Sequence, residues 1–127
     1  MISLHELNPH EYPTDEETKE NLETLLLRMN KIREIWAKPM IITSGLRNKE
    51  HQLKLIVKGV SKATKSNHLI GAACDVKDSD GSLGEWCLKN EKILKEVGLW
   101  CEHPIHSPGW VHFQIVPPKS GKRFFIP

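Results

Sequence analysis

The sequence lacks long apolar runs, a surplus of charge and a cysteine framework. None of its apolar runs approaches the ~20 residues that a membrane-spanning helix needs. The 18 basic and 16 acidic side chains leave a formal net charge of +2, which is too small to attract nucleic acid or anionic lipid. These absences predict no membrane insertion and no nucleic-acid partner, so any specificity has to come from a local site.

Cysteine is scarce, and its spacing suggests neither a cysteine-rich zinc site nor a disulfide framework. Cys74, Cys87 and Cys101 are widely spaced, odd in number and form no CxxC pair, so we expect buried, reduced thiols. The first residues lack the basic start and apolar centre of a signal peptide, which predicts synthesis in the cytoplasm. With 127 residues, 39% of them apolar, the chain is long enough for a single domain, residues 1–127.

Hydrophobic spacing and turn residues predict an α+β fold. The first half of the sequence predicts an irregular lead-in (1–12), a helix of about twenty residues that begins with a capping box (14–17), a short strand (40–43), a weaker helix (48–57) and a polar loop (58–67). The second half predicts a strand (72–76), a turn (78–81) and a helix that is capped by Ser82 and ended by Gly98. Two strands joined as a hairpin (99–102 and 110–115) and a basic loop (119–123) follow. No βαβ unit repeats, so we expect a small antiparallel sheet with helices packed on one face.

His68, Asp75 and His112 are the candidate metal ligands. Three small residues between the first two (71–73) allow the backbone to bend and bring both side chains to one centre. His112 lies between two apolar residues of a predicted strand and therefore faces the opposite side from them. Two imidazoles and one carboxylate suit zinc, and three protein ligands leave a fourth position for water, as in catalytic sites. By pattern alone, ordinary surface histidines remain the alternative.

Three segments carry a resemblance to the M15 family of zinc peptidases: Ser-Gly-Leu-Arg (44–47), Ser-Asn-His-Leu-Ile-Gly-Ala-Ala-Cys-Asp (66–75) and Trp-Val-His-Phe (110–113). The family includes D-alanyl-D-alanine carboxypeptidases and L-alanyl-D-glutamate endopeptidases that cut peptidoglycan stem peptides. The resemblance, over residues 12–125, implies the hedgehog/D-Ala-D-Ala-peptidase-like fold and a zinc peptidase of peptidoglycan, an endopeptidase rather than a carboxypeptidase. The chain looks most like phage-associated members, so we expect a monomeric endolysin or virion component of a bacteriophage that acts at the cell wall.

The resemblance also implies roles for individual residues. The three candidate ligands would bind zinc, and Arg47 would hold a substrate carboxylate or the developing oxyanion. Ser66 would bond the substrate or orient His68, with a simple loop cap as the alternative. Position rather than resemblance singles out His103 and His106: they lie in the predicted hairpin loop beside the proposed site, where either could contact the substrate or donate a hydrogen bond in the transition state, with ordinary loop histidines as the alternative.

The general base departs from the common family pattern. Many members place an acid three residues before the last histidine, where this chain has Gly109. Members whose last strand reads Trp-Val-His resemble a layout with the acid at the end of the preceding strand, which Glu102 matches. A hairpin can place Glu102 across from His112, where it would move a proton from water to the leaving amine. The alternative is an exposed rim carboxylate, and the protein would then bind zinc but cleave poorly. Gly109 in place of an acid also leaves open a rival function, a non-catalytic, zinc-stabilised module that binds cell wall or builds a virion.

Overall fold

A computed structural model describes residues 1–48 and 66–127. Its helices (α), 3-10 helices (η) and strands (β) are, in order, α1 (Leu4–Leu7), α2 (Glu16–Trp36), β1 (Ile42–Ser44), η1 (Asn67–Ile70), β2 (Ala73–Asp78), α4 (Ser82–Lys89), α5 (Glu91–Val97), β3 (Trp100–Glu102), η2 (Pro104–His106), β4 (Gly109–Gln114) and β5 (Phe124–Phe125). Nearly all of the helix predicted over 48–57, and most of the loop predicted over 58–67, fall outside the described residues.

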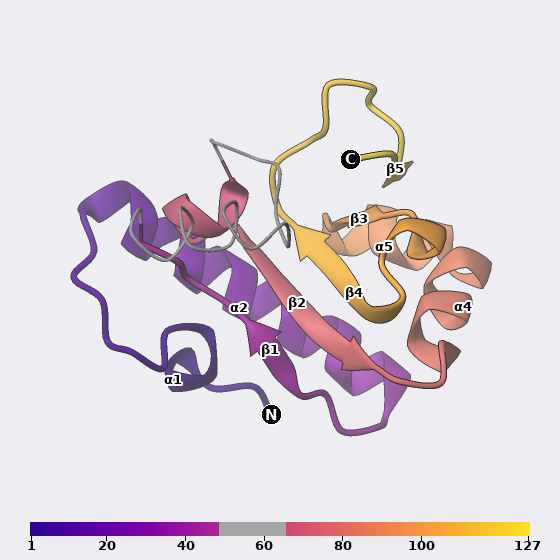
Figure 1. The fold of residues 1–127 in the computed structure, drawn as a ribbon, viewed down its shortest axis with the longest axis horizontal. Coiled ribbons are helices and arrows are strands. Elements are labelled where there is room, and N and C mark those ends of the chain that lie inside the picture. Colours follow the sequence, from indigo (N-terminus) through magenta and orange to yellow (C-terminus); the bar gives the residue numbers. More distant parts are fainter. Residues whose placement is uncertain (49–65) are drawn as a thin grey trace.

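The five strands form one sheet in the order β1-β2-β4-β3-β5. Every neighbouring pair is antiparallel except β3 and β5, which run parallel. In Figure 1, α2 runs along the back of β1 and β2, and α4 and α5 lie beyond β4. The predicted α+β class, a mainly antiparallel sheet with helices packed on one face, is confirmed.

The hydrophobic core lies between α2 and the sheet. Leu25, Met29 and Ile32 of the predicted helical stripe are fully buried. Alternate residues of the central strands, Val76 and Phe113 among them, belong to the same buried cluster. All three cysteines are buried and free, as the sequence predicted, and burial raises the pKa of the Cys74 and Cys101 thiols. The other face of the central strands is thereby left for polar side chains.

The N-terminal segment is more regular than predicted. Instead of an irregular lead-in, Ser3 and Glu6 form a capping box around the short helix α1. The predicted capping box at Thr14 is wrong, because Asp15 is the residue that caps α2 and accepts the Thr18 N–H at 2.7 Å. A carboxylate is the better cap here, since its negative charge also interacts favourably with the helix N-terminus.

The single helix predicted after the turn at 78–81 is two helices. Gly81, with φ of 75°, is the residue that precedes α4, so Ser82 begins the helix rather than capping it. The buried Asp78 carboxylate caps α4 instead, because it accepts two backbone N–H groups of its first turn at 3.0 and 2.8 Å. Asn90 separates α4 from α5, and Gly98 ends α5 as predicted.

The predicted hairpin is confirmed as β3 and β4, but the chain after it forms a further strand. Beyond the basic loop at 119–123, the tail returns to lie beside β3 as β5. The Cys101 N–H donates to the Arg123 carbonyl at 2.9 Å, and the His103 N–H donates to the Phe125 carbonyl at 2.8 Å. A two-residue strand has too short a pattern for the sequence to reveal.

Helix η1 packs directly against α2. The Asn21 side-chain amide on α2 donates to the Ile70 carbonyl at 2.9 Å. Gly71 ends η1 with φ of 71°, and a Cβ there would lie 2.8 Å from Leu22 Cγ and 2.9 Å from the Thr18 carbonyl oxygen. This close approach therefore requires glycine, and it fixes where the chain enters β2.

We expect Gly71→Ala to destabilise the fold more than Gly81→Ala. Both positions have positive φ, so alanine costs about 1–2 kcal/mol at either one. Only at Gly71 does the new methyl group meet α2, which adds about 1–3 kcal/mol of overpacking, whereas nothing lies within 4 Å of a Cβ at Gly81. Urea unfolding of both variants measures the difference. Equal losses would show that η1 does not press on α2.

Candidate metal centre

Asp75 on β2 and His112 on β4 lie directly opposite each other in the sheet. Their neighbours along each strand are buried in the core, so alternation directs both side chains to the face away from α2. Asp75 Oδ1 lies 2.9 Å from His112 Nδ1. The strand register thus brings together two ligand candidates that are 37 residues apart.

His68 reaches the same carboxylate from η1. The Ser66 hydroxyl caps this 3-10 helix by accepting the His68 backbone N–H at 3.2 Å. The imidazole is almost fully buried; its Nδ1 lies 2.9 Å from the Gly45 carbonyl oxygen, and its Nε2 lies 3.4 Å from Asp75 Oδ1. Because a carbonyl only accepts, Nδ1 carries a hydrogen, and Nε2 is the ring nitrogen that faces the centre.

The turn after β1 holds that carbonyl in place. A Cβ on Gly45 would overlap the Leu7 carbonyl of α1, so only glycine allows this approach. The Leu46 N–H donates to the same Leu7 carbonyl at 2.7 Å, and the Arg47 N–H donates to the His68 carbonyl at 3.0 Å. Helix α1, which the sequence did not predict, therefore supports the metal-ligand candidate through the turn at 45–47.

His68, Asp75 and His112 form a cluster of candidate ligands, and its electrostatics centre on the Asp75 carboxylate. Burial would raise the pKa of its carboxyl, but hydrogen bonds with His112 and His68 outweigh burial and hold that pKa well below its usual range. At His112 burial lowers the pKa, and the bond and charge of Asp75 overcome it, so the pKa is raised. At His68 burial dominates and lowers the pKa. The carboxylate is therefore kept ionised by positive charge beside it, which a cation can also supply.

The three residues fit a metal ion. One ligand atom from each of His68, Asp75 and His112 lies within 4.8 Å of the others. Imidazole nitrogens and a carboxylate oxygen are donors that zinc accepts, and the outer nitrogen of His68 is held by a carbonyl, as is usual for metal-ligating histidines. The predicted convergence of these three side chains is found, and the identity of the ion stays a prediction.

Arg47 lies at the edge of the cluster. Its Nη2 is 3.4 Å from Asp75 Oδ2, and its Nε donates to the Ser44 hydroxyl at 3.0 Å. Burial lowers the pKa of the guanidinium, and the negative charge of Asp75 opposes that effect. Asp75 and Ser44 thus help to orient the Arg47 side chain at the wall of the site.

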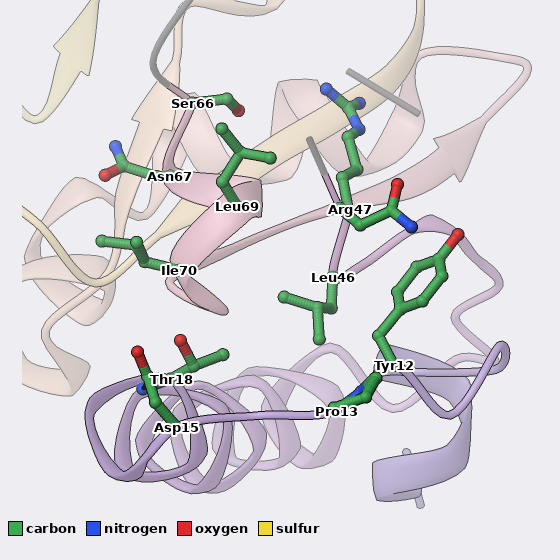
Figure 2. Close-up of a pocket in the computed structure, with 11 residues that line it drawn as sticks. Tyr12, Pro13, Asp15, Thr18, Leu46, Arg47, Ser66, Asn67, Leu69 and Ile70 are labelled. Atoms are coloured by element: carbon green, nitrogen blue, oxygen red, sulfur yellow. Dashed lines mark hydrogen bonds between the residues drawn. The ribbon is translucent and has the colours of Figure 1, made fainter. Parts of the chain in front are cut away.

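A cavity of about 560 Å³ lies between the start of α2, η1 and the segment after β1. Arg47 and Ser66 line it, as does Tyr12 from the segment before α2. Figure 2 shows Arg47 and Ser66 at the end of the cavity away from α2, with Tyr12 on its flank. The cavity adjoins the cluster through Arg47, which contacts Asp75, and through Ser66, which accepts the His68 backbone N–H.

Glu102 lies at the end of β3, beside the cluster. The pair Cys101↔Phe113, continued by one residue, places Glu102 opposite His112. The side chain is half-buried, and burial raises the pKa of its carboxyl while the positive charge of His112 opposes this. A half-buried carboxyl with a raised pKa beside three candidate metal ligands fits the predicted role of Glu102 in proton transfer, and that role stays a prediction.

His103 and Gly109, which the sequence analysis also singled out, lie outside the cluster of candidate ligands. His103 caps η2 by accepting the Ile105 N–H, and its ring packs against Phe124 with centroids 6.3 Å apart. Gly109, at the position where many M15 members have an acid, begins β4 with φ of 93° and pairs with Asp78. Substrate contacts by His103 and Ser66 stay predictions.

Three residues of the site were not expected from the sequence. The Gly45 carbonyl is a backbone group, for which no side-chain pattern exists. Gln114 lies two residues after His112 on the same strand face, a spacing that could have revealed it. Phe125 packs on the His112 ring with centroids 6.0 Å apart, and it arrives there only through the unpredicted strand β5.

Comparison with known proteins decides the family. The family profile described as Peptidase M15 matches residues 6–112 of this chain. The chain belongs to the peptidase M15 family. This M15 peptidase is similar in fold to the crystal structure of the Serratia marcescens L-Ala D-Glu endopeptidase ChiX, with a TM-score of 0.57 and 21% identity over 91% of this chain and 99% of that one. No curated protein matches it significantly. Among the described residues, no helix is long and apolar enough to cross a membrane.

The lowered pKa of Asp75 predicts that the unfolding free energy of the metal-free protein decreases in acid. Its pKa in the folded state lies below its ordinary value of 3.8, so the unfolded state takes up protons first as the pH falls. The stability contributed by Asp75 is therefore complete well above that ordinary value, and it is lost progressively as the pH falls below about 5. We expect the unfolding free energy of Asp75→Asn to fall less than that of the wild type over this acid range.

Urea unfolding of chelator-treated proteins, repeated at several pH values, measures this slope. Glu20→Gln, which removes an exposed carboxyl on α2, is the matched control and keeps the wild-type slope. Parallel acid profiles for wild type and Asp75→Asn would contradict the assignment of a stabilised carboxylate to this position.

Proposed function

We propose that this M15 peptidase is zinc-dependent and hydrolyses a peptide bond of the peptidoglycan stem, as an endopeptidase. The observation that carries the proposal is the convergence of His68, Asp75 and His112, whose ligand atoms lie within 4.8 Å of one another in a chain of this family. The substrate class is supported by the fold similarity to a protein described as an L-Ala D-Glu endopeptidase. The substrate would then be in the bacterial cell wall.

His68, Asp75 and His112 are the residues that would hold the ion. Bound there, zinc would polarise the scissile carbonyl and lower the pKa of water to about 7. The protein supplies a carboxylate that is already ionised and a histidine whose outer nitrogen is already engaged with a backbone carbonyl. Little rearrangement is therefore required of these side chains when the metal binds.

Glu102 is the proton-transfer group of this proposal. Its half-buried carboxyl has a raised pKa, which brings the protonated and ionised forms closer in free energy near neutral pH. As a carboxylate it takes the proton of the attacking water, and as an acid it delivers that proton to the leaving amine. Its place opposite His112, on the paired strand, is what supports this role.

Arg47 orients the substrate and steadies negative charge. Asp75 and Ser44 hold the guanidinium at the wall of the site, so little side-chain freedom is lost when it meets a substrate. The adjoining cavity, lined by Arg47 and Ser66, has a volume in the range of small-ligand sites and would receive part of the stem peptide. The stem carries carboxylates, which a guanidinium binds through paired hydrogen bonds.

Zinc dependence predicts the outcome of a digestion experiment. Purified peptidoglycan incubated with zinc-loaded protein should release new free amino groups, which amine labelling counts and mass analysis of the fragments assigns to one bond. Chelation should stop the release, and zinc, but not magnesium, should restore it, because magnesium prefers oxygen ligands. Absence of new amino groups with the metal fully loaded would instead favour the non-catalytic module.

Glu102→Gln separates catalysis from metal binding. We expect it to keep zinc affinity and to lower kcat by about 10²–10⁴-fold, the usual contribution of a positioned acid–base group. Glu96→Gln, on the exposed surface of α5, is the control that removes the same charge away from the site. Wild-type turnover in Glu102→Gln would remove this residue from the mechanism.

A further inference from the structure

The buried side chain of Gln114 joins His112 to the backbone at the end of β4. Gln114 is 4% exposed and lies on the same strand face as His112. Its Nε2 donates to the Val116 carbonyl at 2.7 Å, and its Oε1 lies 2.8 Å from His112 Nε2. This amide therefore contacts the ring nitrogen of His112 that faces away from Asp75.

The contacts of Gln114 with Val116 and with His112 fix which atom donates and which accepts in each of these two hydrogen bonds. The Val116 carbonyl can only accept, so the NH₂ group of Gln114 must face it, and the amide oxygen must face His112. That oxygen also only accepts, so His112 Nε2 must carry a hydrogen. Without a metal, His112 Nδ1 also carries a hydrogen and donates it to Asp75 Oδ1 at 2.9 Å; a metal that binds at Nδ1 takes the place of that hydrogen, while Nε2 keeps its own.

The two histidines of the cluster thus turn opposite ring nitrogens toward Asp75, and each ring is held by a different kind of group. A backbone carbonyl, that of Gly45, holds the hydrogen on Nδ1 of His68 and leaves Nε2 toward Asp75. A side chain, that of Gln114, holds the hydrogen on Nε2 of His112 and leaves Nδ1 toward Asp75. Of these two contacts, only the one from the Gln114 side chain can be removed by a substitution that leaves the backbone path unchanged.

We propose that Gln114 is a positioning residue that selects Nδ1 of His112 as the metal-binding nitrogen and holds its ring in the binding orientation. This inference rests on the zinc site of the proposed function and adds to it the group that prepares one ligand. Outer hydrogen-bond partners of this kind fix the tautomer of a ligating histidine and raise its basicity.

Zinc affinity, measured by competition with a chromophoric chelator, tests the proposal without any assay of activity. Gln114→Met keeps the length and apolar volume of the side chain but offers His112 no comparable acceptor, so we expect zinc to bind about 10–100-fold more weakly. Gln114→Glu loses the donor to Val116 but keeps an acceptor for His112 Nε2, so its affinity should recover most of that loss.

Asn30→Ala is the control for loss of a half-buried, hydrogen-bonded amide. Asn30 on α2 exchanges two hydrogen bonds with the backbone of Ile2, at 2.7 and 3.0 Å, and belongs to no part of the cluster. It should lower thermal stability and leave zinc affinity unchanged. Wild-type affinity in Gln114→Met, or equal affinities in Gln114→Met and Gln114→Glu, would overturn the proposal.

Nitrogen-15 correlation spectra of the zinc-loaded wild type give a second measurement, the protonated ring nitrogen of each histidine, which would not depend on Gln114 if this side chain only filled space. The couplings of the ring protons identify which nitrogen is protonated, and we expect Nε2 for His112 and Nδ1 for His68. The opposite tautomer at His112 would contradict the role of Gln114 while leaving the zinc site intact. A wild type that binds no zinc would instead remove the proposed function, and this inference with it.

Discussion

The carboxylate of Asp75 is the group around which the site is arranged. One of its oxygens, Oδ1, faces both imidazoles, at 2.9 Å from His112 and 3.4 Å from His68, while Oδ2 faces Arg47. A buried carboxylate without such partners would be protonated, because burial disfavours its charged form. The neighbours keep it ionised instead, and the ionised form is the one that binds a cation. The two histidines are thereby held near the position that a shared ion requires, before any ion is present.

The scaffold supports this arrangement through close backbone approaches. The antiparallel register of β2 and β4 sets Asp75 opposite His112 at the centre of the sheet, where both strands are paired on their two sides. Glycine at 71 lets η1 press against α2, and glycine at 45 lets the turn before Arg47 press against α1. Neither helix carries a ligand, yet together they determine where His68 lies. Residues remote from the chemistry therefore contribute to its geometry.

Much of the fold could be predicted because its signals are local and periodic. The stripe on α2, the glycine after α5 and the alternation around His112 each follow from a repeating pattern within one element. The misassigned ends have a physical reason: several residues near a helix start can cap it, and Asp15 and Asp78 prevailed over Thr14 and Ser82. Helix α1 and strand β5 are too short to carry a hydrophobic repeat, although the capping box of Ser3 and Glu6 is a sequence signal for α1. The ligands were predictable from chemistry and resemblance, whereas Gly45, Gln114 and Phe125 act through contacts that only the folded chain creates.

The central claim is that one zinc ion binds between these three side chains. Anomalous diffraction at the zinc absorption edge, from crystals of protein reconstituted with one equivalent of zinc, tests it most directly. The account predicts a single strong peak, within bonding distance of His68, Asp75 and His112, and one zinc per chain by elemental measurement. A peak elsewhere, or bound zinc with the three side chains turned away from it, would contradict the account.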